Sequence, residues 1–245
     1  MKINAFTNEN LTSYEKLFDF KNKKVLTVVG SSDQYFASLL YGAKTVDLYD
    51  INPEVIDYFF LKFEALKNLT YEEFKELFIN SKFQNYAIYE KLRYYLPIKI
   101  KRKFDSLLFS RKDFIIYSSI SNFPLNFSTD RIIPYLNELK YYELQKILLN
   151  TVYPNIIIED LENITNINYD LLLTSNIFQW KTLTIEDYLK YLDSLNIPQI
   201  QAMYIYNSIQ EKRFLFEQLD YITLPVNPSN YNNQLNDFVV LKRKL

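Results

Sequence analysis

A short apolar run that stops at a glycine is the feature that most constrains this chain. Residues 25–29 read Val-Leu-Thr-Val-Val, and the next residue is Gly30, one of only 2 glycines in 245 residues. A β-branched run of this length is typical of a strand buried on both faces, as in a parallel sheet. The glycine gives the backbone freedom to turn tightly where the strand ends. The run therefore predicts a central strand followed by a sharp turn.

The next 40 or so residues repeat the alternation of strand and helix. Ser31, Ser32 and Asp33 are good N-cap residues for a helix over 34–41, which Gly42 would end. A second strand is expected at 45–50 and a longer helix at 54–68. Strand, turn, helix and strand in this order form a βαβ unit, which implies parallel strands and a right-handed crossover.

The rest of the chain extends this pattern into one α/β domain covering residues 1–245. Further parallel strands are expected near 156–158, 169–175 and 200–206, with a helix over 185–195. The Asn- and Pro-rich end predicts an antiparallel pair of edge strands. The stretch at about 70–150 has broken helical periodicity and is expected to be a helical insertion. The fold class predicted is a Rossmann-like, mostly parallel sheet.

Composition excludes several kinds of site. The chain has no Cys and no His, so it cannot form thiolate or imidazole metal sites, disulfides or catalytic triads based on histidine. No metal is predicted, and any metal would have to be oxygen-bound. The 28 basic and 29 acidic residues give a net charge of −1, which exerts no general attraction on nucleic acid or membranes. Without a secretory signal or a long apolar segment, we expect a soluble cytoplasmic protein. Nothing indicates its oligomeric state.

The loops that follow the predicted strands are the expected binding site. In an open parallel sheet, ligands bind beyond the carboxyl ends of the strands, where the strand order reverses. This rule brings together the loops at 30–33, 50–53 and 175–180. Asp50 lies 20 residues after Gly30 and ends the second strand. An acidic side chain there can accept hydrogen bonds from both ribose hydroxyls of a nucleotide-like ligand.

The first loop favours a positively charged nucleoside over a dinucleotide. A bound pyrophosphate would need the G-x-G-x-x-G spacing, whereas this loop has one glycine and places Asp33 where the anion would lie. Asp33 could instead pair with a ligand ammonium or sulfonium, and S-adenosylmethionine carries both. The alternative is that Gly30 merely ends a strand, Asp33 caps a helix and Asp50 is a solvated strand end.

A third carboxylate follows the strand at 156–158. Asp160 could accept from the exocyclic amine of an adenine, and the backbone N–H of Leu161 could donate to a ring nitrogen. A capping role for Asp160 is the alternative.

Several segments resemble one protein family. The string Asp50-Ile51-Asn52-Pro53, with 61–66 and 69–74, resembles the D-x-N-P…L-K…A…L-x-Y-E-E-F segment of BtaA-like proteins, and 169–180 resembles their strand-four motif. These proteins are relatives of the S-adenosylmethionine:diacylglycerol 3-amino-3-carboxypropyltransferase of betaine-lipid synthesis, with a class I methyltransferase-like fold. The likeness touches roughly residues 25–80 and 155–195. The first loop here has fewer glycines than is typical of the family, and residues 80–150 show no counterpart of the lipid enzyme's substrate-binding part.

The resemblance implies S-adenosylmethionine as cofactor, with Asp33 at its amino end, Asp50 at the ribose and Asp160 at the adenine. The expected cofactor-binding residues are Gly30, Ser31, Ser32, Asp33, Asp50, Ile51, Asn52, Asp160, Leu161 and Ser175.

The function predicted is transfer of a 3-amino-3-carboxypropyl or methyl group to a small-molecule or lipid acceptor. Such a displacement needs chiefly alignment and exclusion of water. Asn176 is the candidate for orienting the acceptor and Trp180 for walling the site, although Trp180 could equally be core. The alternative function is a catalytically inactive nucleoside-binding or interaction protein.

A basic stretch at 91–112 offers a further surface. Its Lys and Arg residues are interleaved with aromatic ones, so it could contact an anionic surface such as lipid head groups or nucleic-acid phosphates. The alternative is a solvated helix face with an apolar underside.

Overall fold

The strands of the predicted βαβ unit lie inside a sheet of 7 strands in the computed structural model. The structure describes residues 2–7, 9–80, 85–109, 115–117, 132–164, 168–175, 177, 184–195, 197–206, 221–226, 230–231, 234–235 and 237–243. The strands, in spatial order, are β5 (Ile156–Ile157), β3 (Thr45–Tyr49), β2 (Lys24–Val28), β6 (Leu171–Leu173), β7 (Gln199–Tyr206), β11 (Asp237–Arg243) and β8 (Tyr221–Val226).

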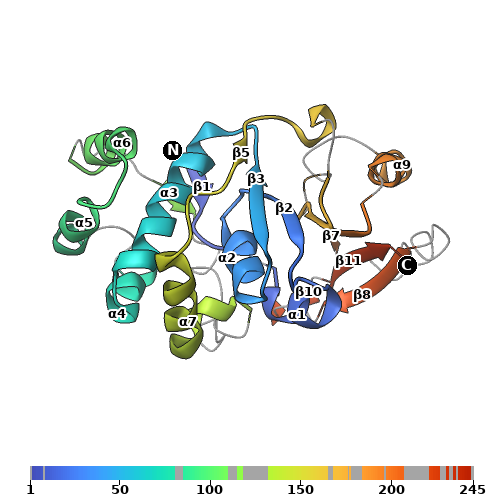
Figure 1. Ribbon diagram of the computed structural model, residues 1–245, viewed down its shortest axis with the longest axis horizontal. Helices are drawn as coiled ribbons and strands as arrows, with labels where there is room; N and C mark the ends of the chain where they lie inside the picture. The colour runs from blue at the N-terminus through green and yellow to red at the C-terminus, as the bar shows by residue number, and fades with distance from the viewer. Residues whose placement is uncertain are drawn as a thin grey trace.

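The sheet is parallel except for one strand. β2 pairs in parallel with β3 and β6, and β11 pairs antiparallel with both β7 and β8. The predicted antiparallel pair at the C-terminal end is thus confirmed, with β11 inserted between β7 and the edge strand β8 (Figure 1). The chain moves outward from β2 through β3 to β5 and then returns to the other side of β2 with β6. The fold is an α/β Rossmann-like sheet.

Alternating side chains of the central strands serve two hydrophobic layers. Val25 and Val29 pack in the cluster formed with α2 (Asp33–Leu40), α3 (Pro53–Asn68) and α7 (Glu138–Leu149). Leu26 and Val28 face the other layer, to which α9 (Ile185–Ser194) contributes Leu192. Both faces of β2 are therefore buried, as its continuous apolar sequence predicts.

Local signals set the start of the helices that carry the site. Asn52 caps α3, its side chain accepting from the backbone N–H of Glu54 at 2.9 Å, and Pro53 occupies the first turn, where its missing N–H costs nothing. Ser32 precedes α2 but makes no side-chain capping bond, because its backbone is left-handed with φ of 72°. Ser32 is thus the N-cap residue of α2, but its side chain does not cap the helix.

Helices fill most of the segment between β3 and β5. α4 (Tyr71–Lys75), the π-helical η2 (Glu76–Asn80), α5 (Tyr86–Leu92) and α6 (Ile98–Phe109) come first, and α5 and α6 lie at the end of the molecule farthest from β8 and β11 (Figure 1). α7 then packs against α2 and α3. The remaining elements are β1 (Lys2–Asn4), paired with β4 (Ile115–Tyr117), the short pair β9 (Asn230–Tyr231) and β10 (Gln234–Leu235), α1 (Tyr14–Leu17), and the 3-10 turns η1 (Leu11–Ser13), η5 (Pro134–Leu136) and η6 (Leu161–Asn163).

Candidate functional site

The strand order reverses between β2 and β6, so the expected ligand position lies beyond the carboxyl ends of these two strands. Gly30 lies in the loop after β2, and Thr174 and Ser175 follow the end of β6. Gly30, Ser32 and Ser175 all have positive φ values, of 45°, 72° and 54°. Non-glycine residues in this conformation are strained, and such strain clusters at functional sites. Both loops at the reversal point thus hold unusual backbone.

Asp50 connects the loop after β3 to the loop after β2. Its carboxylate accepts from the backbone N–H of Gly30 at 3.1 Å and from that of Asn52 at 2.9 Å. Burial raises the pKa of Asp50, and the hydrogen bonds to backbone N–H groups oppose that rise. The structure therefore brings together the two residues that the sequence spacing singled out, with the carboxylate fixed at the carboxyl edge.

Asp33 lies deeper than its predicted role requires. It is fully buried, and it accepts from the backbone N–H of Thr7 at 2.5 Å, from the Ser31 hydroxyl at 2.9 Å, and from Lys62 and Tyr135. Asp33 was expected to pair with a ligand cation, but the structure gives it a cation of the chain itself. A ligand ammonium could reach this carboxylate only by displacing Lys62.

Lys62 is the partner that sequence reasoning missed. Its ammonium also donates to the carbonyls of Ala5 at 2.8 Å and Ser31 at 2.9 Å, and it lies 4.3 Å from the centre of the Phe6 ring. Burial lowers the pKa of Lys62 to about 8, although Asp33 acts in the opposite direction. One signal was available, because Lys62 lies one turn after Tyr58 on the apolar face of α3.

A second buried carboxylate, Glu9, lies in the N-terminal segment and is 1% exposed. It accepts from the Tyr14 hydroxyl at 2.5 Å, from the Gln34 side-chain amide at 2.9 Å and from the Ser175 hydroxyl. Burial raises the pKa of Glu9, and these hydrogen bonds oppose the rise. No feature of the sequence near Glu9 indicates these contacts, because two of its partners lie far along the chain.

The network continues into β7. The Gln201 side chain accepts from the backbone N–H of Ser175 at 3.0 Å and donates to the Tyr14 hydroxyl at 2.8 Å. The predicted cofactor-binding residue Ser175 is thus held between Glu9 and Gln201.

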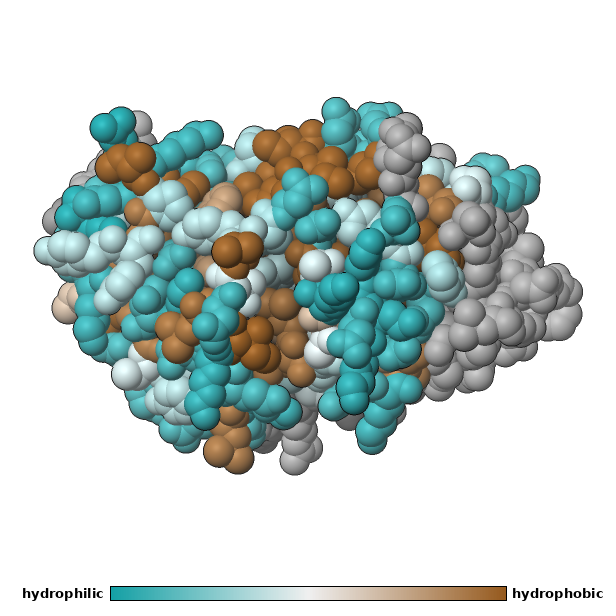
Figure 2. All heavy atoms as spheres, viewed as in Figure 1, coloured by the Kyte–Doolittle hydropathy of each residue, from teal (hydrophilic) through white to brown (hydrophobic). Residues whose placement is uncertain are grey.

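The other side of the site lies near the ends of β3 and β5. The backbone N–H of Asp50 donates to the carbonyl of Ile157 at 3.1 Å, which brings the two strand ends together. Ile51 is 66% exposed and Ile158 is 61% exposed. Figure 2 shows a hydrophobic patch over the region in which Figure 1 places the upper ends of β3 and β5. An apolar surface beside Asp50 suits the face of a flat aromatic group.

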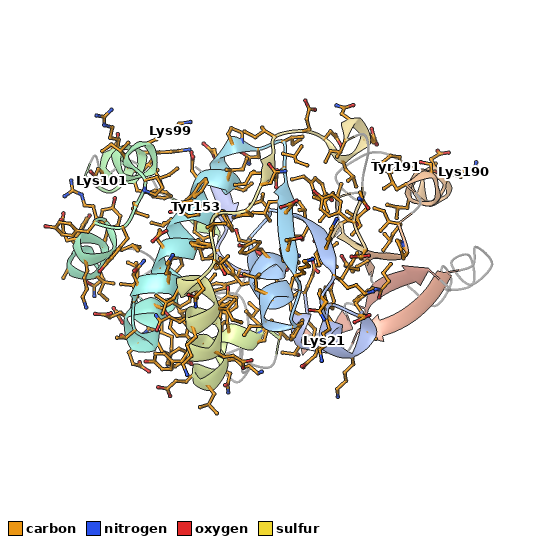
Figure 3. The ribbon with its side chains drawn as sticks, viewed as in Figure 1. Lys21, Lys99, Lys101, Tyr153, Lys190 and Tyr191 are labelled. Atoms are coloured by element: carbon orange, nitrogen blue, oxygen red, sulfur yellow. The ribbon has the colours of Figure 1, made fainter. Side chains whose placement is uncertain are left out.

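Asp160 and Leu161 follow β5 and open η6. The Asp160 side chain accepts from the backbone N–H of Glu162 at 3.3 Å, which is the capping role named as the alternative. The Leu161 carbonyl accepts from the hydroxyl of Tyr191, a residue of α9 labelled in Figure 3, at 2.6 Å. Leu161 itself is buried. The two residues lie on the expected edge of the sheet, and their contact with an adenine stays a prediction.

The two predicted catalytic residues, Asn176 and Trp180, lie outside the described residues. Their roles stay predictions. The part of the chain that is described contains no group of three or more acidic side chains able to hold a metal ion. It also contains no helix with the length and apolar character needed to cross a membrane.

The basic stretch at 91–112 is partly neutralised. Lys91 pairs with Glu73, Arg93 with Asp105, and Lys103 with Asp57. The apolar underside named as the alternative is present, since the structure buries Leu92, Leu96, Ile100 and Phe104. The turn after α5 nevertheless exposes Tyr94, at 85%, and α6 begins with Ile98, which is 63% exposed and lies next to Lys99, labelled in Figure 3. Contact with an anionic surface stays a prediction.

Comparison with known proteins gives likeness of overall structure alone. No protein-family model and no curated protein sequence matches this chain. Among solved structures, a ribosomal protein L11 methylase from Lactobacillus delbrueckii subsp. bulgaricus is similar at 12% identity and a TM-score of 0.42, covering 98% of this chain and 81% of that one. A SAM dependent methyltransferase from Aquifex aeolicus is similar at 11% identity and a TM-score of 0.43, covering 96% and 89%. Likeness at this level does not extend to activity or substrate.

Proposed function

We propose that this protein binds S-adenosylmethionine at the carboxyl edge of its sheet and transfers an alkyl group from it. The observation that carries the proposal is the position of Asp50, held by the backbone N–H groups of Gly30 and Asn52 at the end of β3. A carboxylate offers about four lone-pair sites, so Asp50 keeps acceptor capacity for a ribose hydroxyl beside its backbone donors. The reversal of strand order beside β2 is where such a fold binds its ligand.

The residues around Asp50 fit an adenosine group. A Cβ atom added at Gly30 would meet nothing within 4 Å, so the backbone leaves room there for a ligand. The Ser32 hydroxyl is buried and has no hydrogen-bond partner in the described part of the chain. Buried polar atoms without partners are rare and call for an explanation, and a ligand group supplies one. The exposed Ile51 would lie against the adenine.

Alkyl transfer from a sulfonium requires the protein mainly to position the two reactants. The sulfonium of S-adenosylmethionine supplies an activated carbon, to which the acceptor bonds while the C–S bond breaks and its electron pair returns to sulfur. The protein must align the acceptor and exclude water. We assign the orienting role to Asn176 and the enclosing role to Trp180. The resemblance to BtaA-like proteins favours the 3-amino-3-carboxypropyl group as the one transferred, and a lipid or small molecule as acceptor.

A second candidate is a nucleoside-binding protein without catalysis. The burial of Ser31, Ser32 and Asp33 beneath the N-terminal segment favours it, because this loop makes its contacts within the chain. Product analysis after incubation with S-adenosylmethionine separates the candidates. Methylthioadenosine would indicate aminocarboxypropyl transfer and S-adenosylhomocysteine methyl transfer. Binding without either product, in the presence of lipid and small-molecule acceptors, would favour the second candidate.

We expect Asp50→Asn to weaken binding of S-adenosylmethionine by about ten- to a hundredfold. Asparagine preserves the shape and one acceptor oxygen, but it removes the charge that strengthens hydrogen bonds to the ribose, worth about 1.5–3 kcal/mol. Isothermal titration calorimetry measures the loss, and a comparison of melting temperatures confirms that the variant folds. Affinity equal to that of the unaltered protein would remove Asp50 from the site.

A further inference from the structure

Glu9 is a buried carboxylate surrounded by neutral donors. Its three hydrogen-bond partners, Tyr14, Gln34 and Ser175, carry no positive charge. No ion pair to Glu9 occurs among the described residues. Buried charges in proteins are normally paired with an opposite charge, because removal from water costs several kcal/mol per ion. Asp33 shows the contrast, since it is equally buried but has Lys62 as its counter-ion.

The position of Glu9 is as informative as its burial. Gln34 belongs to α2, which follows β2, and Ser175 follows β6. Glu9 therefore joins the two strand ends between which the order of the sheet reverses. This is the place where a ligand of such a sheet is expected. The same loops carry the left-handed residues Ser32 and Ser175.

Two more polar side-chain atoms near this point have no hydrogen-bond partner among the described residues. The Gln34 amide directs its N–H group to Glu9, while its carbonyl oxygen is buried and makes no hydrogen bond within the described residues. The Ser32 hydroxyl, two residues earlier, is also buried and unpaired there. An anion and two polar atoms without partners thus lie together, and no cation pairs with Glu9 among the described residues.

We propose that Glu9 receives a positively charged group of S-adenosylmethionine, its ammonium or its sulfonium, with the carbonyl of Gln34 as a second acceptor. The inference rests on the proposed function, in which Asp50 holds the ribose. The ligand supplies to Glu9 the counter-ion that the described residues do not. The assignment replaces Asp33, whose charge Lys62 already neutralises.

This arrangement gives the site a means of selecting its ligand. Adenosine shares the ribose and adenine of S-adenosylmethionine but carries no positive charge. An ion pair formed away from water is strong, so Glu9 would add affinity for the charged ligand alone. S-adenosylhomocysteine keeps the ammonium and lacks the sulfonium, so it reports which of the two cations Glu9 contacts.

The test is calorimetry of Glu9→Gln with adenosine, S-adenosylhomocysteine and S-adenosylmethionine. We expect the variant to bind S-adenosylmethionine at least tenfold more weakly, and adenosine within about twofold of the unaltered protein, because glutamine retains the shape but not the charge. An equal loss for S-adenosylhomocysteine assigns the ammonium as the contact. An undiminished affinity for S-adenosylhomocysteine assigns the sulfonium.

Glu64→Gln is the matched control. Glu64 is 7% exposed and accepts from a tyrosine hydroxyl as Glu9 does, but that tyrosine is Tyr153, which lies against α3 in Figure 3. The control should leave all three affinities unchanged. If Glu9→Gln affects no ligand, or weakens adenosine as much as S-adenosylmethionine, the role of Glu9 is wrong while the proposed function survives. If the unaltered protein binds none of the ligands, both proposals fall.

Discussion

Lys62 illustrates how a single side chain can organise several segments. Its ammonium has no exposure to solvent and contacts Asp33, the carbonyl of Ala5 and the carbonyl of Ser31. It therefore joins α3 to the N-terminal segment and to the loop after β2. A buried ion pair of this kind is weak evidence for stability, because desolvation offsets much of the attraction. Removing one partner of the pair is strongly destabilising, because the other charge is left buried and unpaired.

We expect Lys62→Met to lower the free energy of unfolding by about 3–5 kcal/mol, because Asp33 would be left as an unpaired buried charge. Urea unfolding measures the change. Adding Asp33→Asn to Lys62→Met should recover part of the loss, because the double variant has no unpaired charge. Lys67→Met, on the same helix but partly exposed, is the control and should change stability by less than about 0.5 kcal/mol. A loss at Lys62 no larger than at Lys67 would contradict the role of the pair.

Asp50 and Asp33 mark the limit of what the sequence could predict about the site. The contact of Asp50 with Gly30 follows from topology, because parallel strands of one βαβ unit end at the same edge. The surroundings of Asp33 do not follow from any local pattern. Thr7 lies 26 residues before it and Tyr135 lies 102 residues after it. Long-range packing decided its partners.

At the scale of elements, the turn after β2 combines a backbone requirement with a space requirement. Gly30 has a φ of 45°, which side-chain-bearing residues rarely adopt, and a Cβ there would meet nothing within 4 Å. Gly42, the other glycine, has a φ of 86° and its Cβ would lie 3.9 Å from the backbone of Lys21. The two glycines share the backbone requirement, and only Gly30 borders the proposed ligand.

We expect Gly30→Ala and Gly42→Ala each to lower the free energy of unfolding by about 1–2 kcal/mol, the cost of a left-handed backbone with a Cβ atom. Binding should separate them. Gly30→Ala should weaken S-adenosylmethionine by about tenfold, because the methyl group enters the space of the ligand, and Gly42→Ala should not. Chemical denaturation and calorimetry measure the two effects. Equal affinities for the two variants would argue against a ligand beside Gly30.

Most elements of the sheet were predictable because each carries its own signal. The strand after the expected helix at 34–41 is β3, within one residue of the predicted bounds, and the helix at 54–68 is α3. α3 begins after Asn52, whose side chain caps its first turn. The predicted strand at 169–175 is shorter in the structure, because only Leu171–Leu173 pair with β2. The ends of a strand depend on the strands that pair with it, and the local sequence does not reveal those neighbours.

At the scale of the whole molecule, one buried and one partly buried carboxyl group make stability depend on pH in an unusual direction. Burial raises the pKa values of Glu9 and Asp50 above their ordinary values of 4.5 and 3.8. In the pH range between the ordinary and the raised pKa, the folded state binds more protons than the unfolded state. Stability from these groups therefore falls as pH rises through that range. Carboxylates paired with cations behave in the opposite way.

We expect ligand-free Glu9→Gln to be more stable than the unaltered protein near pH 7.5, because it removes an ionised carboxylate that burial disfavours and that the charge of Asp33 repels. The difference should shrink as the pH falls through the raised pKa of Glu9, since the unaltered Glu9 then gains a proton, while Asp50 contributes equally to both chains. The charged state of Tyr14 does not enter, because burial raises its pKa well above 10.0. Thermal unfolding from pH 5 to pH 8 measures the trend.

Saturating S-adenosylmethionine should make the unaltered protein the more stable of the two at pH 7.5, because the ligand binds more tightly to the protein that keeps the Glu9 carboxylate. A stability difference between the two proteins that does not change with pH would show that Glu9 keeps one protonation state throughout. Equal stabilisation of both proteins by the ligand would show that the charge of Glu9 does not contribute to binding.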